Sequence, residues 1–226
     1  MQYNPKFKDI LLRTYWDTFE GSYQMGSQRH RVYMLDLLRE KGVQSILDVG
    51  CGTGPIYELI KNTPQPNEED LPILPRWEFA YKGTDYSPAM IAICKELFLQ
   101  GDFEVQDARK LTEPPNSWDC VLLMHSLDHL NDYKAAIREA ARVAKKYVCI
   151  ILWRSFVNEG TNLNDRNMYG KQPDEAPWED TFLQEYSREA LETEFKNNNL
   201  IIEQTAEGEQ INEEGKYNFL YLLKKV

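Results

Sequence analysis

The sequence has few cysteines and no pattern that gives them a special use. Its 226 residues contain four, which show neither close pairing nor the spacing of metal ligands. It also lacks the ~18 uninterrupted apolar residues of a membrane-spanning helix, and its charged N-terminus lacks the apolar core of a signal peptide. These absences predict a cytoplasmic protein with reduced, buried thiols, no metal site and no membrane partner. The cysteines are Cys51, Cys94, Cys120 and Cys149.

Positive charge is also scarce. Lysine and arginine number 26 against 36 aspartates and glutamates, which gives a net charge of −10. Adjacent lysines occur only at residues 145–146 and 224–225, so the sequence argues against a general role in binding nucleic acid. It does not exclude a local basic groove. No internal repeat is visible. With 42% hydrophobic residues, the length predicts a single domain over residues 1–226 with a full core.

The most informative segment that is present runs from Ile46 to Gly54. Residues 46–49 are mostly apolar and fit a buried parallel strand. Three glycines then turn the chain tightly and let the backbone approach a ligand, and Pro55 suits the first turn of a helix. The glycines are Gly50, Gly52 and Gly54. A strand, a glycine turn and a helix start together predict a nucleotide-sized site at the carboxyl end of a sheet.

The spacing of the glycines separates two classes of ligand. The dinucleotide fingerprint is G-x-G-x-x-G and places a pyrophosphate at a helix N-terminus. Here the spacing is G-x-G-x-G, and Asp48 precedes the turn by two residues. A carboxylate repels a pyrophosphate and suits an ammonium or a sulfonium, so the sequence favours a cationic ligand. A tight turn without any ligand is the remaining alternative.

The segment Leu47 to Gly54 resembles motif I of the class I S-adenosylmethionine-dependent methyltransferases. Residues 82–90, 103–108 and 118–125 resemble the ends of the second, third and fourth strands of that family, in the same order. The resemblance implies an α/β, Rossmann-like fold with a seven-stranded, mostly parallel sheet whose last strand is antiparallel. It also implies S-adenosyl-L-methionine as the cofactor.

The resemblance assigns roles to residues at the ends of strands. Asp85 would hold both ribose hydroxyls, for which an ionised carboxylate is a suitable bidentate acceptor; without the glycine turn it would read as a solvated turn residue. Tyr86 would lie against the adenine, and Asp107 would accept from the adenine amino group. The residues expected to bind the cofactor are Tyr23, Arg29, Arg31, Asp48, Gly50, Cys51, Gly52, Gly54, Asp85, Tyr86, Asp107, Ala108, Met124 and His125.

The segment from Tyr23 to Arg31 is similar to the one that precedes the first strand in some small-molecule N-methyltransferases, glycine N-methyltransferase among them. There an arginine pairs with the carboxylate of the methionine moiety. Arg29 or Arg31 could take this role, because a guanidinium fork fits a carboxylate. A solvated arginine at the start of a helix is the alternative for either one.

Two of the three histidines, His125 and His129, follow the fourth expected strand, where the acceptor would sit. A base is needed only if the acceptor must first lose a proton, and histidine titrates near neutral pH, so both are candidate catalytic residues. His129 shares a face with His125 if this turn is helical; otherwise it hydrogen-bonds within the turn. The segment lacks the Asn-Pro-Pro-Tyr or Asp-Pro-Pro-Tyr motif, which argues against methylation of DNA bases or protein glutamine.

Hydrophobic periodicity and turn residues predict alternating strands and helices. Strands are expected at 45–49, 79–84, 103–106, 120–124, 147–153, 200–205 and 217–224. Helices are expected at 32–39, 56–61, 89–99, 133–144 and 187–197. Three segments fall outside this scaffold: an N-terminal cap at 1–31, a proline-rich surface insertion at 62–77 and a loop at 155–186. The cap and the loop carry aromatic residues and are expected to form the acceptor wall; disorder or a contact between subunits is the alternative.

These features predict an S-adenosylmethionine-dependent methyltransferase that transfers a methyl group to a nitrogen or oxygen atom of a small molecule. Two alternatives stay open. One is a protein that binds the cofactor without turnover, as a sensor or a partner subunit, and the other is a methyltransferase of tRNA or protein, which the negative charge disfavours. The sequence does not choose between nitrogen and oxygen, name the acceptor, or distinguish a monomer from a dimer.

Overall fold

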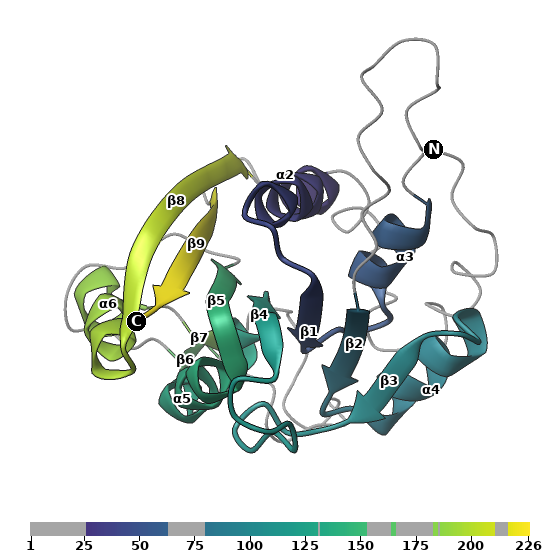
Figure 1. The fold of residues 1–226 in the computed structure, drawn as a ribbon. Coiled ribbons are helices and arrows are strands. Elements are labelled where there is room, and N and C mark those ends of the chain that lie inside the picture. The colour runs from purple at the N-terminus through teal and green to yellow at the C-terminus, as the bar shows by residue number, and fades with distance from the viewer. Residues whose placement is uncertain are drawn as a thin grey trace, which may run out of the picture. The chain divides into compact units, whose positions relative to one another are not determined.

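The computed structural model describes residues 26–62, 80–130, 132–152, 164–165, 183–184, 186–210 and 217–226. Its main sheet has seven strands in the order β3-β2-β1-β4-β5-β9-β8, and β6 and β7 form a separate pair (Figure 1). β9 runs antiparallel to β5 and to β8, whereas the pairs β1–β2, β2–β3 and β4–β5 are parallel. The predicted mostly parallel sheet with an antiparallel last strand is therefore confirmed.

The chain divides into two compact units, Met1–Gln106 and Asp107–Val226. The expectation of a single domain stays a prediction. Of the three segments placed outside the scaffold, the cap and the insertion lie almost entirely outside the described residues, as does most of the loop at 155–186. Among the described residues, no helix is both long and apolar enough to cross a membrane.

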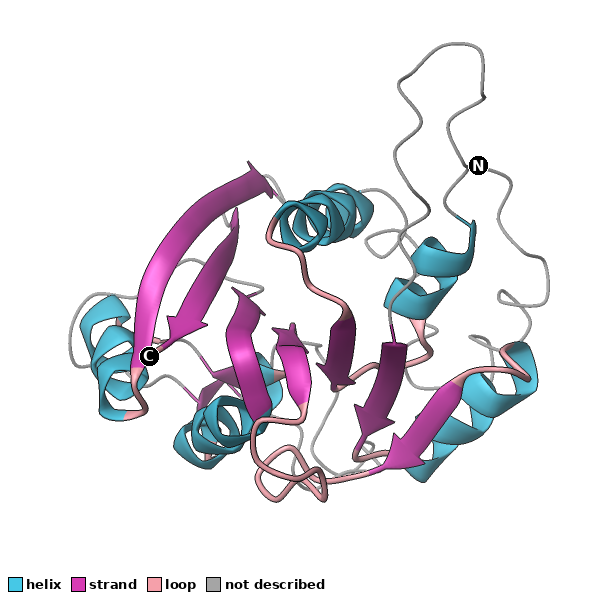
Figure 2. Cartoon of the chain, in the orientation of Figure 1, coloured by secondary structure: helices cyan, strands magenta, loops and turns pink. Residues whose placement is uncertain are grey.

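The first unit alternates helices with parallel strands (Figure 2). Its elements are α2 (Gly26–Glu40), β1 (Ser45–Val49), α3 (Pro55–Asn62), β2 (Ala80–Asp85), α4 (Pro88–Leu97) and β3 (Asp102–Val105). In the parallel register, Asp48 lies opposite Gly83, and Asp85 lies opposite Val105. Both aspartates therefore come at the carboxyl ends of neighbouring strands, the edge at which open α/β sheets bind ligands.

Local sequence explains where α4 begins. The Ser87 side chain accepts a hydrogen bond from the Met90 N–H at 3.4 Å, and Pro88 occupies the first helical position. The helix buries Met90, Ile91 and Cys94 and lies along β3 (Figure 1). Because β2 ends at Asp85, only two residues separate the strand from this helix, so the short connection fixes the position of Asp85.

The second unit contains two buried central strands and an antiparallel hairpin. Its elements are β4 (Trp118–Met124), the 3-10 helix η2 (Leu127–His129), α5 (Tyr133–Val143), β5 (Ala144–Leu152), β6 (Asn164–Asp165), β7 (Leu183–Gln184), α6 (Arg188–Asn197), β8 (Leu200–Gln210) and β9 (Tyr217–Lys225). β4 is buried from Asp119 to Met124, and β5 from Val148 to Leu152. Such continuous burial explains the apolar runs Cys120–Met124 and Val148–Leu152. α5 packs an alanine-rich face against these two strands.

Two differences from the sequence-based expectations stand out in the second unit. The loop at 155–186 contains a short antiparallel pair, since β6 and β7 join Asn164 to Gln184 and Asp165 to Leu183. β8 continues to Gln210, five residues beyond its predicted end at Thr205. The glutamates in this extension made it look unlike a strand, but β8 is the last strand of the sheet, and edge strands tolerate charged side chains.

Candidate ligand site

The glycine turn after β1 needs glycine because of its backbone conformation. Gly50, Gly52 and Gly54 have φ values of 80°, 56° and 81°, in the left-handed region that other residues rarely adopt. At Gly54 an added Cβ would also lie 2.8 Å from the ring of Phe98. The predicted turn is therefore present, and a side chain at Gly54 would require Phe98 to move.

Four N–H groups of this turn are already bound within the protein. Those of Gly50 and Cys51 donate to the Thr84 carbonyl oxygen at 2.7 and 2.9 Å, and that of Gly54 donates to the Cys51 carbonyl oxygen at 3.0 Å. The Gly52 N–H donates to Oδ2 of Asp85 at 2.9 Å. A phosphate at such a turn would need these donors. The turn in this conformation therefore does not offer them to a pyrophosphate.

Asp85 ties the end of β2 to the glycine turn. Besides the bond from Gly52, its Oδ1 accepts a hydrogen bond from the Ser87 N–H at 2.9 Å. Burial raises the pKa of the Asp85 carboxyl, and the two N–H donors oppose this effect. Each carboxylate oxygen can accept a further hydrogen bond, so Asp85 is held in a fixed orientation and keeps capacity for a diol.

Asp48 precedes the first glycine of the turn by two residues, and only 1% of its surface is exposed. Its Oδ2 accepts a hydrogen bond from the Tyr81 hydroxyl at 2.6 Å. Burial raises the pKa of the Asp48 carboxyl to about 6, while Tyr81 and the positive charge of Arg31 lower it and the charge of Asp85 raises it. Arg31 itself is buried on α2, so the solvated alternative for this arginine is wrong.

Cys51 and Tyr86 differ in how they could meet a ligand. The Cys51 thiol is buried, and its neighbour Cys94 also donates to the Gly52 carbonyl oxygen, at 3.1 Å. The hydrogen bond with Cys94 and burial raise the pKa of Cys51 well above its usual value. Tyr86, by contrast, is 71% exposed directly after β2, so its ring surface is open to a flat partner.

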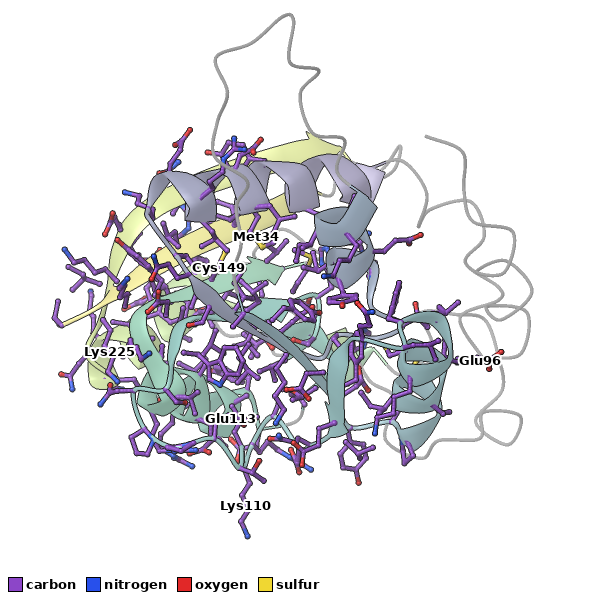
Figure 3. The ribbon with its side chains drawn as sticks, turned by 45° about the vertical axis from the view of Figure 1, so that its right-hand side comes forward. Met34, Glu96, Lys110, Glu113, Cys149 and Lys225 are labelled. Carbon is purple, nitrogen blue, oxygen red and sulfur yellow. The ribbon has the colours of Figure 1, made fainter. Side chains whose placement is uncertain are left out.

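Asp107 in the second unit is engaged by a neighbouring arginine. Nε of Arg109 donates to Oδ1 at 2.9 Å and to Oδ2 at 3.1 Å, and its Nη2 donates to Oδ2 at 2.8 Å. The Arg109 N–H donates to Oδ1 at 2.9 Å. The guanidinium lowers the pKa of the Asp107 carboxyl, and Ala108 between the two is half-buried. Lys110, two residues further along, points away from the fold (Figure 3).

The end of β4 carries a strained turn. His125 directly follows buried Met124 and has φ 53°, and its N–H donates to the Ile151 carbonyl oxygen at 2.8 Å. Both ring nitrogens of His125 are buried. Within the described part of the chain, the buried Ser126 hydroxyl makes no hydrogen bond. Strain and an unsatisfied polar group commonly mark functional positions.

His129 lies at the end of η2, and its N–H donates to the Ser126 carbonyl oxygen at 3.2 Å. His129 was expected to share a face with His125 if this turn were helical. The helical turn is of the 3-10 type and begins at Leu127, after His125, whose backbone is left-handed. The i, i+4 relation of an α-helix therefore does not apply.

The structure brings part of the predicted set together. Hydrogen bonds join the glycine turn, Thr84 and Asp85 in the first unit, and a further bond joins Asp48 to Tyr81 there. Asp107, Ala108, Met124, His125 and His129 belong to the second unit. Tyr23 and the side chain of Arg29 lie outside the described residues.

Three residues near these positions were not singled out from the sequence: Tyr81, Arg109 and Ser126. Tyr81 could have been found from the pairing of the strands, because it precedes by two residues the Gly83 that lies opposite Asp48. Arg109 could have been found from its place two residues after Asp107. Nothing in the sequence marks Ser126.

The chain is similar in sequence to known methyltransferases. A family model described as a methyltransferase domain matches residues 23–205. Ajmaline N-methyltransferase from Rauvolfia serpentina is 32% identical over 119 residues, which are 50% of this chain and 36% of that protein. An O-methyltransferase from Pyrenophora dematioidea is 28% identical over 140 residues, 58% of this chain and 48% of that protein. The chain thus spans about a third to a half of the length of these curated relatives.

Solved structures share the fold at low sequence identity. An S-adenosylmethionine-dependent methyltransferase from Clostridium acetobutylicum has a TM-score of 0.66 at 15% identity and covers 98% of both chains. Magnesium protoporphyrin IX methyltransferase from Synechocystis, with bound S-adenosylmethionine, has a TM-score of 0.63 at 15% identity, covering 98% of this chain and 96% of that one. The [4+2]-cyclase SpnF has a TM-score of 0.64 at 17% identity, covering 91% and 84%.

Proposed function

Because the chain belongs to the methyltransferase-domain family, we propose that it transfers a methyl group from S-adenosyl-L-methionine to a nitrogen or oxygen atom of a small molecule. One observation carries the choice of ligand at the glycine turn. Four of its N–H groups are bound to protein oxygens, one of them to the Asp85 carboxylate, and the buried Asp48 precedes the turn on β1. This arrangement is suited to a cation with a diol and unsuited to a pyrophosphate.

The residues of the first unit supply binding and orientation. The carboxylate of Asp85, fixed by the Gly52 and Ser87 N–H groups, accepts hydrogen bonds from the ribose hydroxyls. The exposed ring of Tyr86 offers a surface for the adenine. Asp48 provides negative charge at the end of β1, just before the turn. When bound, the cofactor supplies an activated methyl group on a sulfonium, so the protein need only hold an acceptor in line with it.

The acceptor side is assigned to the turn after β4. The backbone of His125 is held in a strained conformation next to the buried Ser126 hydroxyl. We place His125 in contact with the acceptor and give His129 the role of base only for acceptors that must lose a proton. The named relatives include both N- and O-methyltransferases, and the net charge of −10 favours a small molecule over a nucleic acid. The four buried free thiols suit a reducing compartment such as the cytoplasm.

A screen with methyl-labelled S-adenosylmethionine tests this proposal. The purified chain is incubated with a panel of amines, alcohols, phenols and carboxylic acids, and label in the products is measured together with S-adenosylhomocysteine. Transfer to at least one small molecule, reduced in an Asp85→Ala variant at low cofactor concentration, is the expected result. Fragmentation of the product by tandem mass spectrometry then distinguishes N-methyl from O-methyl.

Other outcomes would redirect the assignment. Cofactor binding without transfer to any acceptor would favour a sensor or a partner subunit, and label in tRNA or protein would move the substrate class. Binding of NAD in place of S-adenosylmethionine would overturn the proposal altogether. For the acceptor side, His125→Ala is expected to reduce turnover, and full turnover in this variant would remove His125 from the site.

A further inference from the structure

We propose that Tyr81 is a positioning residue that keeps Asp48 ionised and thereby sets the affinity of the glycine turn for a cationic cofactor. The inference rests on the function proposed above, because it assumes a sulfonium ligand at this turn. It adds a residue that lies outside the glycine motif, on the neighbouring strand, and it gives the buried carboxylate a specific partner.

The parallel register of β1 and β2 explains how the two side chains meet. Asp48 lies opposite Gly83, and Tyr81 precedes Gly83 by two residues, so Tyr81 and Asp48 lie diagonally on the same face of the sheet. Gly83 has no side chain to separate them. The Tyr81 hydroxyl therefore reaches Oδ2 of Asp48 at 2.6 Å, and both residues are buried.

The charge of Asp48 depends on a small set of neighbours. Burial favours the neutral acid and raises its pKa to about 6. Two groups favour the carboxylate, namely the Tyr81 hydroxyl from β2 and the Arg31 guanidinium from α2. Asp85 opposes ionisation, and the Cys51 thiol lies close enough to be affected by Asp48 in turn. Because Asp48 titrates just below neutral pH, the loss of one hydrogen bond is enough to change its charge.

The affinity for a cation should follow this charge. An ionised Asp48 in a buried setting attracts a sulfonium or an ammonium more strongly than the same group in water would. A protonated Asp48 offers no such attraction. Cofactor affinity should therefore fall as the pH is lowered through about 6, the pKa of Asp48, and Tyr81→Phe should move this decline to higher pH.

The test compares two tyrosines of one aromatic cluster. Tyr57 on α3 is buried, and the centroid of its ring lies 5.2 Å from that of Tyr81. The hydroxyl that donates a hydrogen bond to Asp48 is that of Tyr81. Dissociation constants for S-adenosylmethionine are measured by calorimetry from pH 5.5 to 8.5 for the unmodified chain, Tyr81→Phe and Tyr57→Phe. Tyr81→Phe should shift the midpoint upward by about one pH unit, with affinity recovered at pH 8.5. Tyr57→Phe should leave the profile unchanged, and any titration of the ligand is common to all three proteins.

Two further measurements make the result decisive. S-adenosylhomocysteine lacks the sulfonium charge, so the effect of Tyr81→Phe on its affinity should be smaller. In an Asp48→Asn background, Tyr81→Phe should no longer shift the profile, because its effect acts through the carboxylate. Equal shifts in Tyr81→Phe and Tyr57→Phe, or profiles that coincide with the unmodified chain, would overturn the proposal.

Failure of the proposed function would look different. In that case the unmodified chain binds no S-adenosylmethionine at any pH. The effect of Tyr81 on the pKa of Asp48 can still be measured in the ligand-free protein, by carbon NMR of the carboxyl group across the same pH range. An Asp48 titration that does not move in Tyr81→Phe would contradict the inference on its own, and a melting curve of each variant confirms that it is folded.

Discussion

Asp85 and Asp107 are aspartates with predicted cofactor roles, and their surroundings differ sharply. Asp85 accepts two backbone N–H groups, whereas both oxygens of Asp107 are bound by the Arg109 guanidinium. Burial raises the pKa of the first, and the arginine lowers the pKa of the second. Backbone donors orient a carboxylate without cancelling its charge, while a guanidinium fork does both.

The difference separates a carboxylate that is prepared for a ligand from one that must first exchange a partner. Asp85 can accept hydroxyl donors without breaking its existing bonds. An adenine amino group at Asp107 would compete with a charged donor that is already in place. The two residues should therefore contribute unequally to cofactor binding, although the family resemblance assigns a role to each.

The largest expected effect is at Asp85. Asp85→Ala should weaken binding of S-adenosylmethionine by about 1–3 kcal/mol, because a charge-assisted acceptor of the ribose hydroxyls is lost. Calorimetry measures this change. Asp102→Asn serves as the control, because Asp102 is exposed and lies at the amino end of β3, whereas Asp85 lies at the carboxyl end of β2. Unchanged affinity in Asp85→Ala would mean that this residue has been misassigned.

A second effect concerns stability at Asp48. Its pKa rises from 3.8 to about 6 on folding, so between these values the folded chain binds more protons than the unfolded chain. The free energy of unfolding should therefore decrease as the pH rises through this window. The free energy of unfolding of Asp48→Asn should not show this decrease. At pH 7.5 it should be higher than that of the unmodified chain by roughly 1–3 kcal/mol, as measured by urea unfolding. Cofactor affinity should fall in the same variant, and a variant less stable at every pH would contradict this reading.

The smallest effects are expected at Asp107 and Arg109. Asp107→Asn should weaken cofactor binding by less than about 1 kcal/mol, because the carboxylate already has a partner and is partly exposed. Arg109→Ala should leave affinity unchanged or raise it slightly, because it releases Asp107 to the adenine amino group. Calorimetry on both variants, beside Asp85→Ala, tests the ranking, and an equal loss at Asp85 and Asp107 would refute it.

The fold followed from the sequence because its signals are local. β1 occupies residues 45–49 as predicted, and α4 begins at the predicted Ser87–Pro88 cap. The glycine turn was visible because three glycines fall within five residues. Each of these features depends on neighbours within a single turn or strand, so hydrophobic pattern and turn chemistry are sufficient to place it.

The contacts of the site were harder to predict because they join distant parts of the chain. Tyr81 and Asp48 are 33 residues apart, and their contact depends on the pairing of two strands across a long insertion. The 3-10 geometry after His125 depends on how the chain leaves β4. A resemblance to a family transfers the positions of such residues, but it does not transfer their hydrogen bonds.

The two thiols beside the glycine turn have a practical consequence. Cys51 and Cys94 are both buried, and both donate to the Gly52 carbonyl oxygen. A thiol-modifying reagent can reach them only when the turn opens, so the rate of modification depends on how often it opens. The modification rate of these two cysteines therefore reports how often the proposed cofactor turn opens, and saturating ligand should lower that rate.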